Sequence, residues 1–157
     1  MTNAALGLGS NLGDRRAHLD GALQALGRVG RILAVSSFRE TAPVGGPPQP
    51  DYLNGAVTLS TAKTPLELLH DAQEIERRAG RERGVAWGPR TLDLDLLLYG
   101  DRIVSEPDLM IPHPRLHERL FVLEPLGEIA PDWLVPGLGR TVGDLLADLR
   151  RRRGAGG

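Results

Sequence analysis

The segment from Leu92 to Gly100, "LDLDLLLYG", limits the possible folds more than any other part of the chain. Side chains of a β-strand alternate between two faces, so Asp93 and Asp95 share one face and the intervening leucines share the other. A leucine face belongs in a core, whereas carboxylates are costly to bury without a partner. The segment therefore predicts a strand with one packed face and one face open to water or to cations.

Apolar periodicity along the rest of the chain predicts further strands and helices. The strands are expected over residues 4–8, 31–38 and 52–60, and the helices over 14–27 and 64–79. Together with the aspartate strand, this order over residues 4–99 is β-α-β-β-α-β, a ferredoxin-like arrangement. Two extra C-terminal helices are expected near 115–124 and 141–152, followed by a frayed arginine-rich tail. We expect one α+β domain over residues 1–157.

Composition excludes several classes of protein. The 157 residues include 19 Lys and Arg against 20 Asp and Glu, so there is no bulk positive charge for nucleic acid or an anionic membrane. Cysteine is absent, which excludes disulfides and thiolate metal sites and fits a reducing cytosol. No apolar run approaches the roughly 18 residues of a membrane span, and the first residues lack the features of a signal peptide. We expect a cytoplasmic protein that binds neither nucleic acid nor membrane.

The glycines of "GLGSNLG" raise the question of a phosphate-binding loop. The dinucleotide motif G-x-G-x-x-G requires a glycine where this chain has Leu12, and the P-loop requires G-K-[ST]. The only lysine, Lys63, lies in "TAKTP", so neither motif is present. These residues favour a plain strand-to-helix turn, and any phosphate contacts must come from arginine.

The aspartate pair has such arginines on both sides. Arg81, Arg83 and Arg90 precede it, and Arg115 and Arg119 follow it. Magnesium binds one or two protein carboxylates and completes its shell with water and phosphate oxygens, while arginine binds phosphate through two hydrogen bonds. The combination indicates ATP chemistry. The alternative is a half-exposed acidic strand that forms surface ion pairs with arginine.

Three other residues are weaker candidates. Tyr52 and Asn54 share a strand face after the proline- and glycine-rich segment 40–51, where they could stack on and hydrogen-bond a planar heterocycle. On their own, these two residues are better explained by a half-exposed strand. His113 lies between two prolines, which disfavours a helical metal pair with His117 and favours a positioned phosphate contact.

Six segments taken together resemble the 6-hydroxymethyl-7,8-dihydropterin pyrophosphokinase family of folate biosynthesis: "GSNLGD", "ETAPVGG", "DYLNGAV", "GRER", "WGPRTLDLDLLLYG" and "IPHPRLHERLFVLEPL". The resemblance covers nearly the whole chain. It implies a ferredoxin-like αβα sandwich and the transfer of the terminal diphosphate of ATP to the pterin hydroxymethyl group, with release of AMP. It also implies a monomer.

The resemblance implies a role for particular residues. Asp93 and Asp95 would hold two Mg²⁺ ions on the triphosphate, and phosphate oxygens would contact Arg90, His113 and Arg119. Arg81 and Arg83 would belong to a closing loop, and the nucleotide would lie against Gln73, Glu76, Trp87 and Leu96. Tyr52 and Phe121 would sandwich the pterin, and its edge would meet Asn54, Gly9 and the backbone of Thr41, Ala42 and Val44. No residue is assigned as general base.

Two departures and two alternatives remain. Only "GVA" separates Arg83 from Trp87, where some family members have a longer basic stretch, and Ala42 stands where some have a second proline. A nucleotidyl-transfer palm would share the fold and the metal-binding aspartates, but its first strand carries an acid that "AALGL" lacks. A ligand-sensing ferredoxin-like module would explain the fold but not the aspartate pair.

Overall fold

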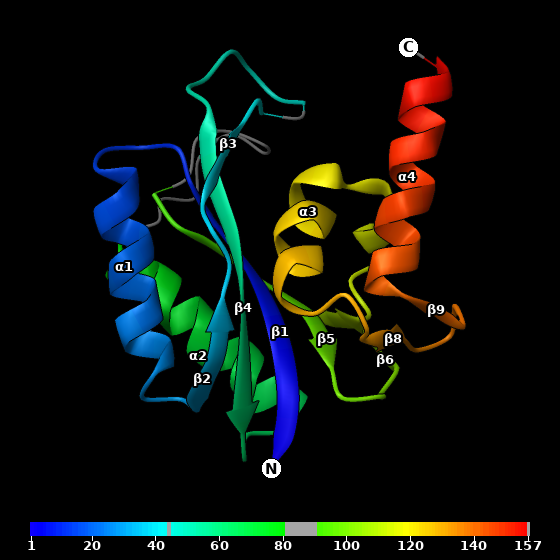
Figure 1. Ribbon diagram of the computed structural model, residues 1–157. Helices are drawn as coiled ribbons and strands as arrows, with labels where there is room; N and C mark the ends of the chain where they lie inside the picture. Colours follow the sequence, from blue (N-terminus) through cyan, green and yellow to red (C-terminus); the bar gives the residue numbers. More distant parts are fainter. Residues whose placement is uncertain (44, 81–90, 157) are drawn as a thin grey trace.

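The computed structural model describes residues 1–43, 45–80 and 91–156, which form a central sheet with helices on both faces (Figure 1). Its elements in chain order are β1 (Thr2–Ser10), α1 (Arg15–Leu26), β2 (Arg31–Val35), β3 (Arg39–Thr41), β4 (Tyr52–Thr61), α2 (Pro65–Arg78), β5 (Asp93–Tyr99), β6 (Val104–Glu106), β7 (Leu109–Ile111), the 3-10 helix η1 (Leu116–Glu118), α3 (Leu120–Ile129), β8 (Leu134–Val135), β9 (Arg140–Thr141) and α4 (Val142–Gly156).

The strand order confirms the predicted fold class. The sheet runs β2-β4-β1-β5, every neighbouring pair is antiparallel, and the short strand β3 adds to β4. With α1 after β1 and α2 after β4, this is the ferredoxin-like βαββαβ order. Helices α1 and α2 cover one face, and α3 and α4 cover the other (Figure 1).

The face under α1 and α2 is a closed core. Leu6, Val57 and Leu59 are fully buried there, and Leu94 and Leu96 of β5 pack into the same cluster. The predicted alternation of the aspartate strand is therefore confirmed, because Leu92, Leu94 and Leu96 belong to this face. Helix α2 begins as the sequence indicated, with Thr64 and Glu67 forming a capping box.

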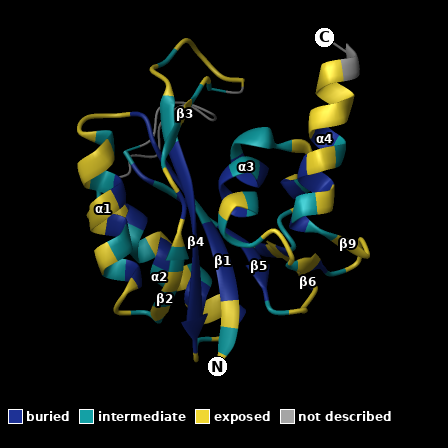
Figure 2. Cartoon of the chain, viewed as in Figure 1, coloured by how far each residue is buried: buried dark blue, intermediate teal, exposed yellow. Residues whose placement is uncertain are grey.

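The opposite face carries a second core under α3 and α4, which occupies only part of the sheet. Ala5, Ala56 and Leu98 lie in it together with residues of both helices. Leu97 lies on this face by alternation with Asp93 and Asp95, and the extra residue that β5 contains opposite Ala5 and Leu6 turns Leu98 to the same face. Figure 2 shows buried residues running along β1, β4 and β5 between the two helical layers.

The structure corrects three predicted boundaries. The second strand ends at Val35, and a separate strand, β3, begins at Arg39 and pairs with β4. The helix expected near 115–124 is split into η1 and α3, so the α-helix begins at Leu120. Helix α4 continues to Gly156, so the arginine-rich tail is helical rather than frayed. Among the described residues, no helix is long and apolar enough to cross a membrane.

Candidate active site

Two rows of residues cross β4, β1 and β5 on the sheet face that carries α3. Residues directly opposite each other in an antiparallel pair project to the same face. Gly9 of β1 lies between Asn54 of β4 and Asp93 of β5, and Gly7 lies between Ala56 and Asp95. Because β1 contributes only glycines here, the middle of both rows has no side chain. The result is a floor with a buried amide at one side and two partly exposed carboxylates at the other.

Gly9 is enclosed by its neighbours on the β4 side. A Cβ at this position would overlap the Asn54 Oδ1 atom and lie 3.4 Å from Cδ1 of Tyr52. The Asn54 Nδ2 group donates a hydrogen bond to Thr41 Oγ1, which joins β4 to the end of β3. The structure thus brings together four of the residues that the resemblance assigned to the pterin, namely Gly9, Thr41, Tyr52 and Asn54.

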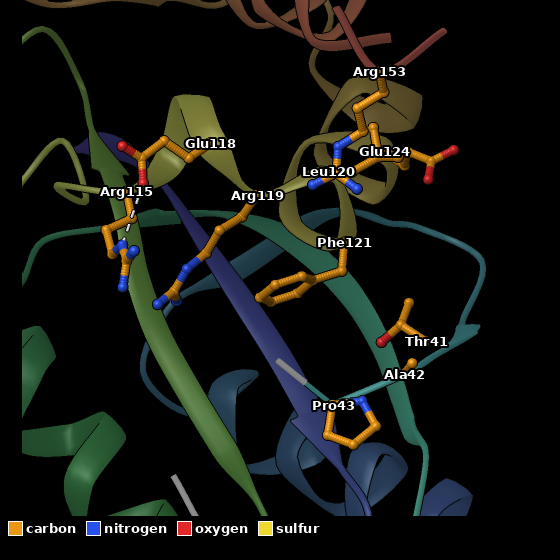
Figure 3. A pocket seen from close by; sticks show the side chains of 10 residues that line it. All are labelled: Thr41, Ala42, Pro43, Arg115, Glu118, Arg119, Leu120, Phe121, Glu124 and Arg153. Atoms are coloured by element: carbon orange, nitrogen blue, oxygen red, sulfur yellow. Dashed lines mark hydrogen bonds and ion pairs between the residues drawn. The ribbon is translucent and has the colours of Figure 1, made fainter. Parts of the chain in front are cut away.

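A pocket of about 380 Å³ opens beside this floor, between the end of β3 and the start of α3. Its walls include Thr41, Ala42 and Pro43 on one side and Leu120 and Phe121 on the other (Figure 3). The Phe121 ring points into the space between Pro43 and Arg119, and the Arg119 guanidinium lies 5.6 Å from the ring centroid. The pocket therefore offers an aromatic surface with a cation at its edge.

His113, Arg115 and Arg119 form a positively charged group next to the pocket. Burial, with the charges of Arg119 and Arg115, lowers the pKa of His113 below its ordinary value of 6.5. Its Nδ1 atom accepts a hydrogen bond from the Arg115 backbone N–H at 3.3 Å, which leaves the Nε2–H of the neutral ring as a donor. Helix α3 begins without a side-chain cap or an acid in its first turn, so its partial positive charge adds to the arginines.

Two hydrogen bonds are formed at the outer edge of β5, the edge that does not pair with β1. The backbone N–H of Leu94 donates to Glu76 Oε2 at 2.9 Å, and the His113 N–H donates to the Leu97 carbonyl at 3.0 Å. Glu76 is only 4% exposed, so this carboxylate belongs to the packing between α2 and β5. Gln73, one turn earlier on α2, is exposed. The side chain of Leu96 lies in the core under α1 and α2, on the face opposite the aspartates.

Five predicted site residues lie outside the part of the chain that the structure describes. They are Val44, Arg81, Arg83, Trp87 and Arg90.

A magnesium site was tested against the donors that are present. In the described ranges, no group of three or more His, Cys, Asp or Glu could hold a metal ion. Magnesium requires fewer, because one or two carboxylates suffice when substrate phosphates and water fill the other positions. Asp93 and Asp95, two residues apart on one strand face and partly exposed, fit that requirement.

Sequence reasoning missed the residues that anchor the segment between β3 and β4. Asn11 is 2% exposed, and its Nδ2 group donates to Gln49 Oε1 and to the Pro50 carbonyl, both at 2.9 Å. Arg15 donates to the Asp51 carbonyl at 3.1 Å and pairs with Glu40. The "GSN" turn therefore positions the segment between β3 and β4. The only sequence signal for this role was the amide residue Asn11 directly after the small residue Ser10.

Comparisons with known proteins identify the family of the chain. The model of the family described as 7,8-dihydro-6-hydroxymethylpterin-pyrophosphokinase matches residues 5–131. Among curated relatives, the 2-amino-4-hydroxy-6-hydroxymethyldihydropteridine pyrophosphokinase of Synechocystis is 49% identical, over 91% of this chain and 74% of its own length. The enzyme of the same name from Methylorubrum extorquens is 45% identical, over 95% of this chain and 94% of its own length.

The fold also matches a solved structure. The crystal structure of wild-type Plasmodium falciparum HPPK-DHPS with SDX-DHP superposes with a TM-score of 0.78 over 99% of this chain at 18% identity. The present chain spans 45% of that longer protein. On the family match and on identities between 44% and 49% over most of the chain, it belongs to the 7,8-dihydro-6-hydroxymethylpterin pyrophosphokinase family, the ATP-dependent pyrophosphokinases of folate biosynthesis.

Proposed function

We propose that the chain carries out its pyrophosphokinase reaction over these two rows, with the pterin on the β4 side and the triphosphate on the β5 side. The observation that carries this proposal is the row Asn54–Gly9–Asp93, which spans the two sides with no side chain between them. The hydroxymethyl group of 6-hydroxymethyl-7,8-dihydropterin would attack the β-phosphorus of ATP. A new O–P bond forms, the bond from that phosphorus to the α-phosphate oxygen breaks, and AMP leaves.

On the pterin side, Tyr52 and Phe121 would stack on the two faces of the ring. The Phe121 ring points into the pocket (Figure 3), and Tyr52 borders Gly9 on the neighbouring strand. Asn54 would pair with the polar edge of the ring, and its hydrogen bond to Thr41 fixes the direction in which the amide points. The backbone of Thr41, Ala42 and Val44 would complete the edge, and Gly9 leaves room for the ring to approach the sheet.

On the triphosphate side, Asp93 and Asp95 would hold two Mg²⁺ ions, which neutralise charge on the phosphate oxygens when bound. Further positive charge would come from Arg90 and Arg119, and from Arg81 and Arg83 of the proposed closing loop. His113 would donate from Nε2 to a phosphate oxygen, in keeping with its accepting Nδ1 and its lowered pKa. These donors would orient the chain of phosphates in line with the hydroxyl.

The nucleotide would lie against the outer edge of β5 and the end of α2. The Leu94 N–H points to that edge, since it donates to Glu76. In an antiparallel strand alternate residues direct their backbone groups the same way, so the backbone of Leu96 faces the same edge although its side chain is buried. Leu96 would therefore contribute backbone groups, with Gln73 and Trp87 beside it. We further propose that the chain is a monomer in the cytoplasm.

A product assay tests this proposal. Protein, Mg²⁺, ATP and 6-hydroxymethyl-7,8-dihydropterin are incubated, and the nucleotide products are separated. AMP that forms only when the pterin is present is the expected result. ADP would indicate ordinary phosphoryl transfer, and released pyrophosphate would indicate a nucleotidyl-transfer palm. Either product, or none from folded protein, would overturn the proposal.

A further inference from the structure

Four charged residues connect three elements beside the pocket, and we call them the Arg39–Glu124 network. They are Arg39 of β3, Glu124 and Glu128 of α3, and Arg150 of α4. Arg39 Nη1 lies 3.2 Å from Glu124 Oε2, and Arg39 Nη2 lies 3.2 Å from Glu128 Oε1. Arg150 Nη2 lies 3.1 Å from the same Glu124 oxygen. Glu124 thus joins β3 to α4 through α3.

A further pair of contacts strengthens the α3 end of this network. The backbone N–H and the hydroxyl of Ser37 donate to Glu128 at 2.7 and 2.6 Å. These hydrogen bonds and the neighbouring Arg39 lower the pKa of Glu128. The segment leading into β3 is therefore attached to α3 at two positions, Ser37 and Arg39.

The network adjoins both walls of the pocket. On β3, Arg39 lies two residues before Thr41, where one wall begins. On α3, Glu124 lies three residues after Phe121, so the two share a helix face, and Glu124 itself lines the pocket. On α4, Arg153 also lines the pocket and shares a helix face with Arg150. Figure 3 shows Arg153 and Glu124 together, with the Phe121 ring pointing towards Arg119.

The charges of the network favour a positional role over a large contribution to stability. Two arginines and two glutamates balance, and their side chains are between 30% and 55% exposed. Ion pairs this exposed contribute at most about 1 kcal/mol each. A shift of about 1 Å in a substrate-binding wall can nevertheless reduce a reaction rate strongly.

We propose that Glu124 and Arg150 are positioning residues of the pterin pocket, which hold Phe121 at a fixed distance from the wall formed by residues 41–43. Helix α4, which lies outside the segment 5–131 that the family model matches, is then part of the substrate site. This inference rests on the proposed function, since it assigns the pocket to the pterin.

Steady-state kinetics with saturating Mg²⁺ and ATP test the inference in Glu124→Gln and Arg150→Ala. Each variant is expected to raise the KM for the pterin roughly fivefold, the scale of one such ion pair, while kcat and the KM for ATP stay near the wild-type values. The double variant is expected to be no worse than Glu124→Gln alone, because both changes remove the same contact. Arg150→Lys, which keeps the charge, is expected to restore most of the affinity.

Arg152→Ala is the matched control, because Arg152 is an exposed arginine on the same helix and is not among the residues that line the pocket. It is expected to leave all three kinetic constants unchanged. A pterin KM within about twofold of wild type in both test variants, or an equal rise in Arg152→Ala, would overturn the inference. Failure of the proposed function would be recognised by a different result, because the wild-type protein would then form no AMP that depends on the pterin.

Discussion

Two neighbouring rows of residues across β4, β1 and β5 differ in the side chains they contain. The row Val57–Leu6–Leu96 faces α1 and α2, and all three side chains are at most 5% exposed. The next row along, Ala56–Gly7–Asp95, faces the other way and ends in a partly exposed carboxylate. A step of one residue along each strand therefore separates a fully buried apolar row from a row that ends in a partly exposed carboxylate.

This difference separates stability from reaction chemistry in a simple way. The face under α1 and α2 is packed by leucine and valine, so changes there are expected to act on the free energy of unfolding. The opposite face carries glycine, asparagine and aspartate next to its own core. Changes there are expected to act on substrate binding and turnover, and the following substitutions test this division.

The largest effect is expected for Asp95→Asn. Loss of one carboxylate removes a proposed metal ligand, and we expect the rate of AMP formation to fall roughly 10³-fold, as for removal of other electrostatic groups that act on a transition state. The free energy of unfolding is expected to change by less than about 1 kcal/mol, since Asp95 is partly exposed. Coupled assays of AMP and thermal unfolding measure the two quantities.

The exposed turn residue Asp101 provides the control for that experiment. Asp101→Asn removes the same charge on the chain following β5 and is expected to leave the rate unchanged. If Asp95→Asn kept more than about a tenth of the wild-type rate, the carboxylate pair would not be the metal site proposed above.

Leu59→Ala is the corresponding change on the closed face. Leu59 is fully buried between β4 and the helices, so its truncation is expected to cost about 3 kcal/mol of folding free energy through lost burial and an added cavity. The KM values of the protein that remains folded are expected to stay unchanged. Urea denaturation gives the free energy, and Leu33→Ala on β2, 42% exposed, is expected to cost less than about 0.5 kcal/mol. A raised pterin KM in Leu59→Ala would show that the two faces are coupled.

Gly9→Ala is expected to have a smaller effect, confined to the pterin side of the face that carries α3. The added Cβ would overlap the Asn54 amide, so the amide must turn away from the pterin edge. We expect the KM for the pterin to rise about tenfold, within the range for a lost hydrogen bond in a buried site, while the KM for ATP changes little. Isothermal titration with the pterin measures the same loss directly.

Gly21→Ala is the matched glycine control, because a Cβ at this helical position meets nothing within 4 Å. It is expected to stabilise α1 by up to about 1 kcal/mol without altering either KM. Unchanged pterin affinity in Gly9→Ala would mean that the ring does not approach the sheet at this row.

The sequence predicted those parts of the fold and site that depend on local alternation. The leucines and aspartates of β5, the faces of β4 and the capping box of α2 followed from spacing alone, because each is fixed within a few residues. The resemblance supplied the assignment of Phe121 and Asn54, and the structure brings their elements to one end of the sheet. The roles assigned to these residues stay predictions.

Features that depend on contacts distant in sequence could not be read from the chain. Strand β3 exists because Arg39 to Thr41 pair with β4, and nothing local distinguishes these residues from the loop around them. The arginine tail is helical, and its Arg150 contacts Glu124, 26 residues earlier. The pocket likewise combines residues 41–43 with residues of α3 and α4. Spacing along one segment carries no information on such pairs.

The smallest expected effect concerns protonation of His113 on the triphosphate side. Its pKa is lowered in the folded chain by burial and by Arg119 and Arg115, so the folded protein favours the neutral ring. The resulting stability is fully present above the ordinary value of 6.5 and is lost as the pH falls through the lower, folded pKa. His113→Gln is expected to remove this part of the pH dependence, which chemical denaturation at several pH values measures.

Binding of the triphosphate is expected to reverse that shift. Phosphate charge beside the ring favours the imidazolium, so Mg²⁺ with a non-hydrolysable ATP analogue should raise the pKa of His113, as followed by NMR titration of its ring protons. A titration with Mg²⁺ alone is the reference. If the pKa of His113 stayed constant while the analogue bound, the histidine would not contact the phosphates. A rise in the pKa of His113 would support binding of the triphosphate on the β5 side of this face, apart from the pterin side.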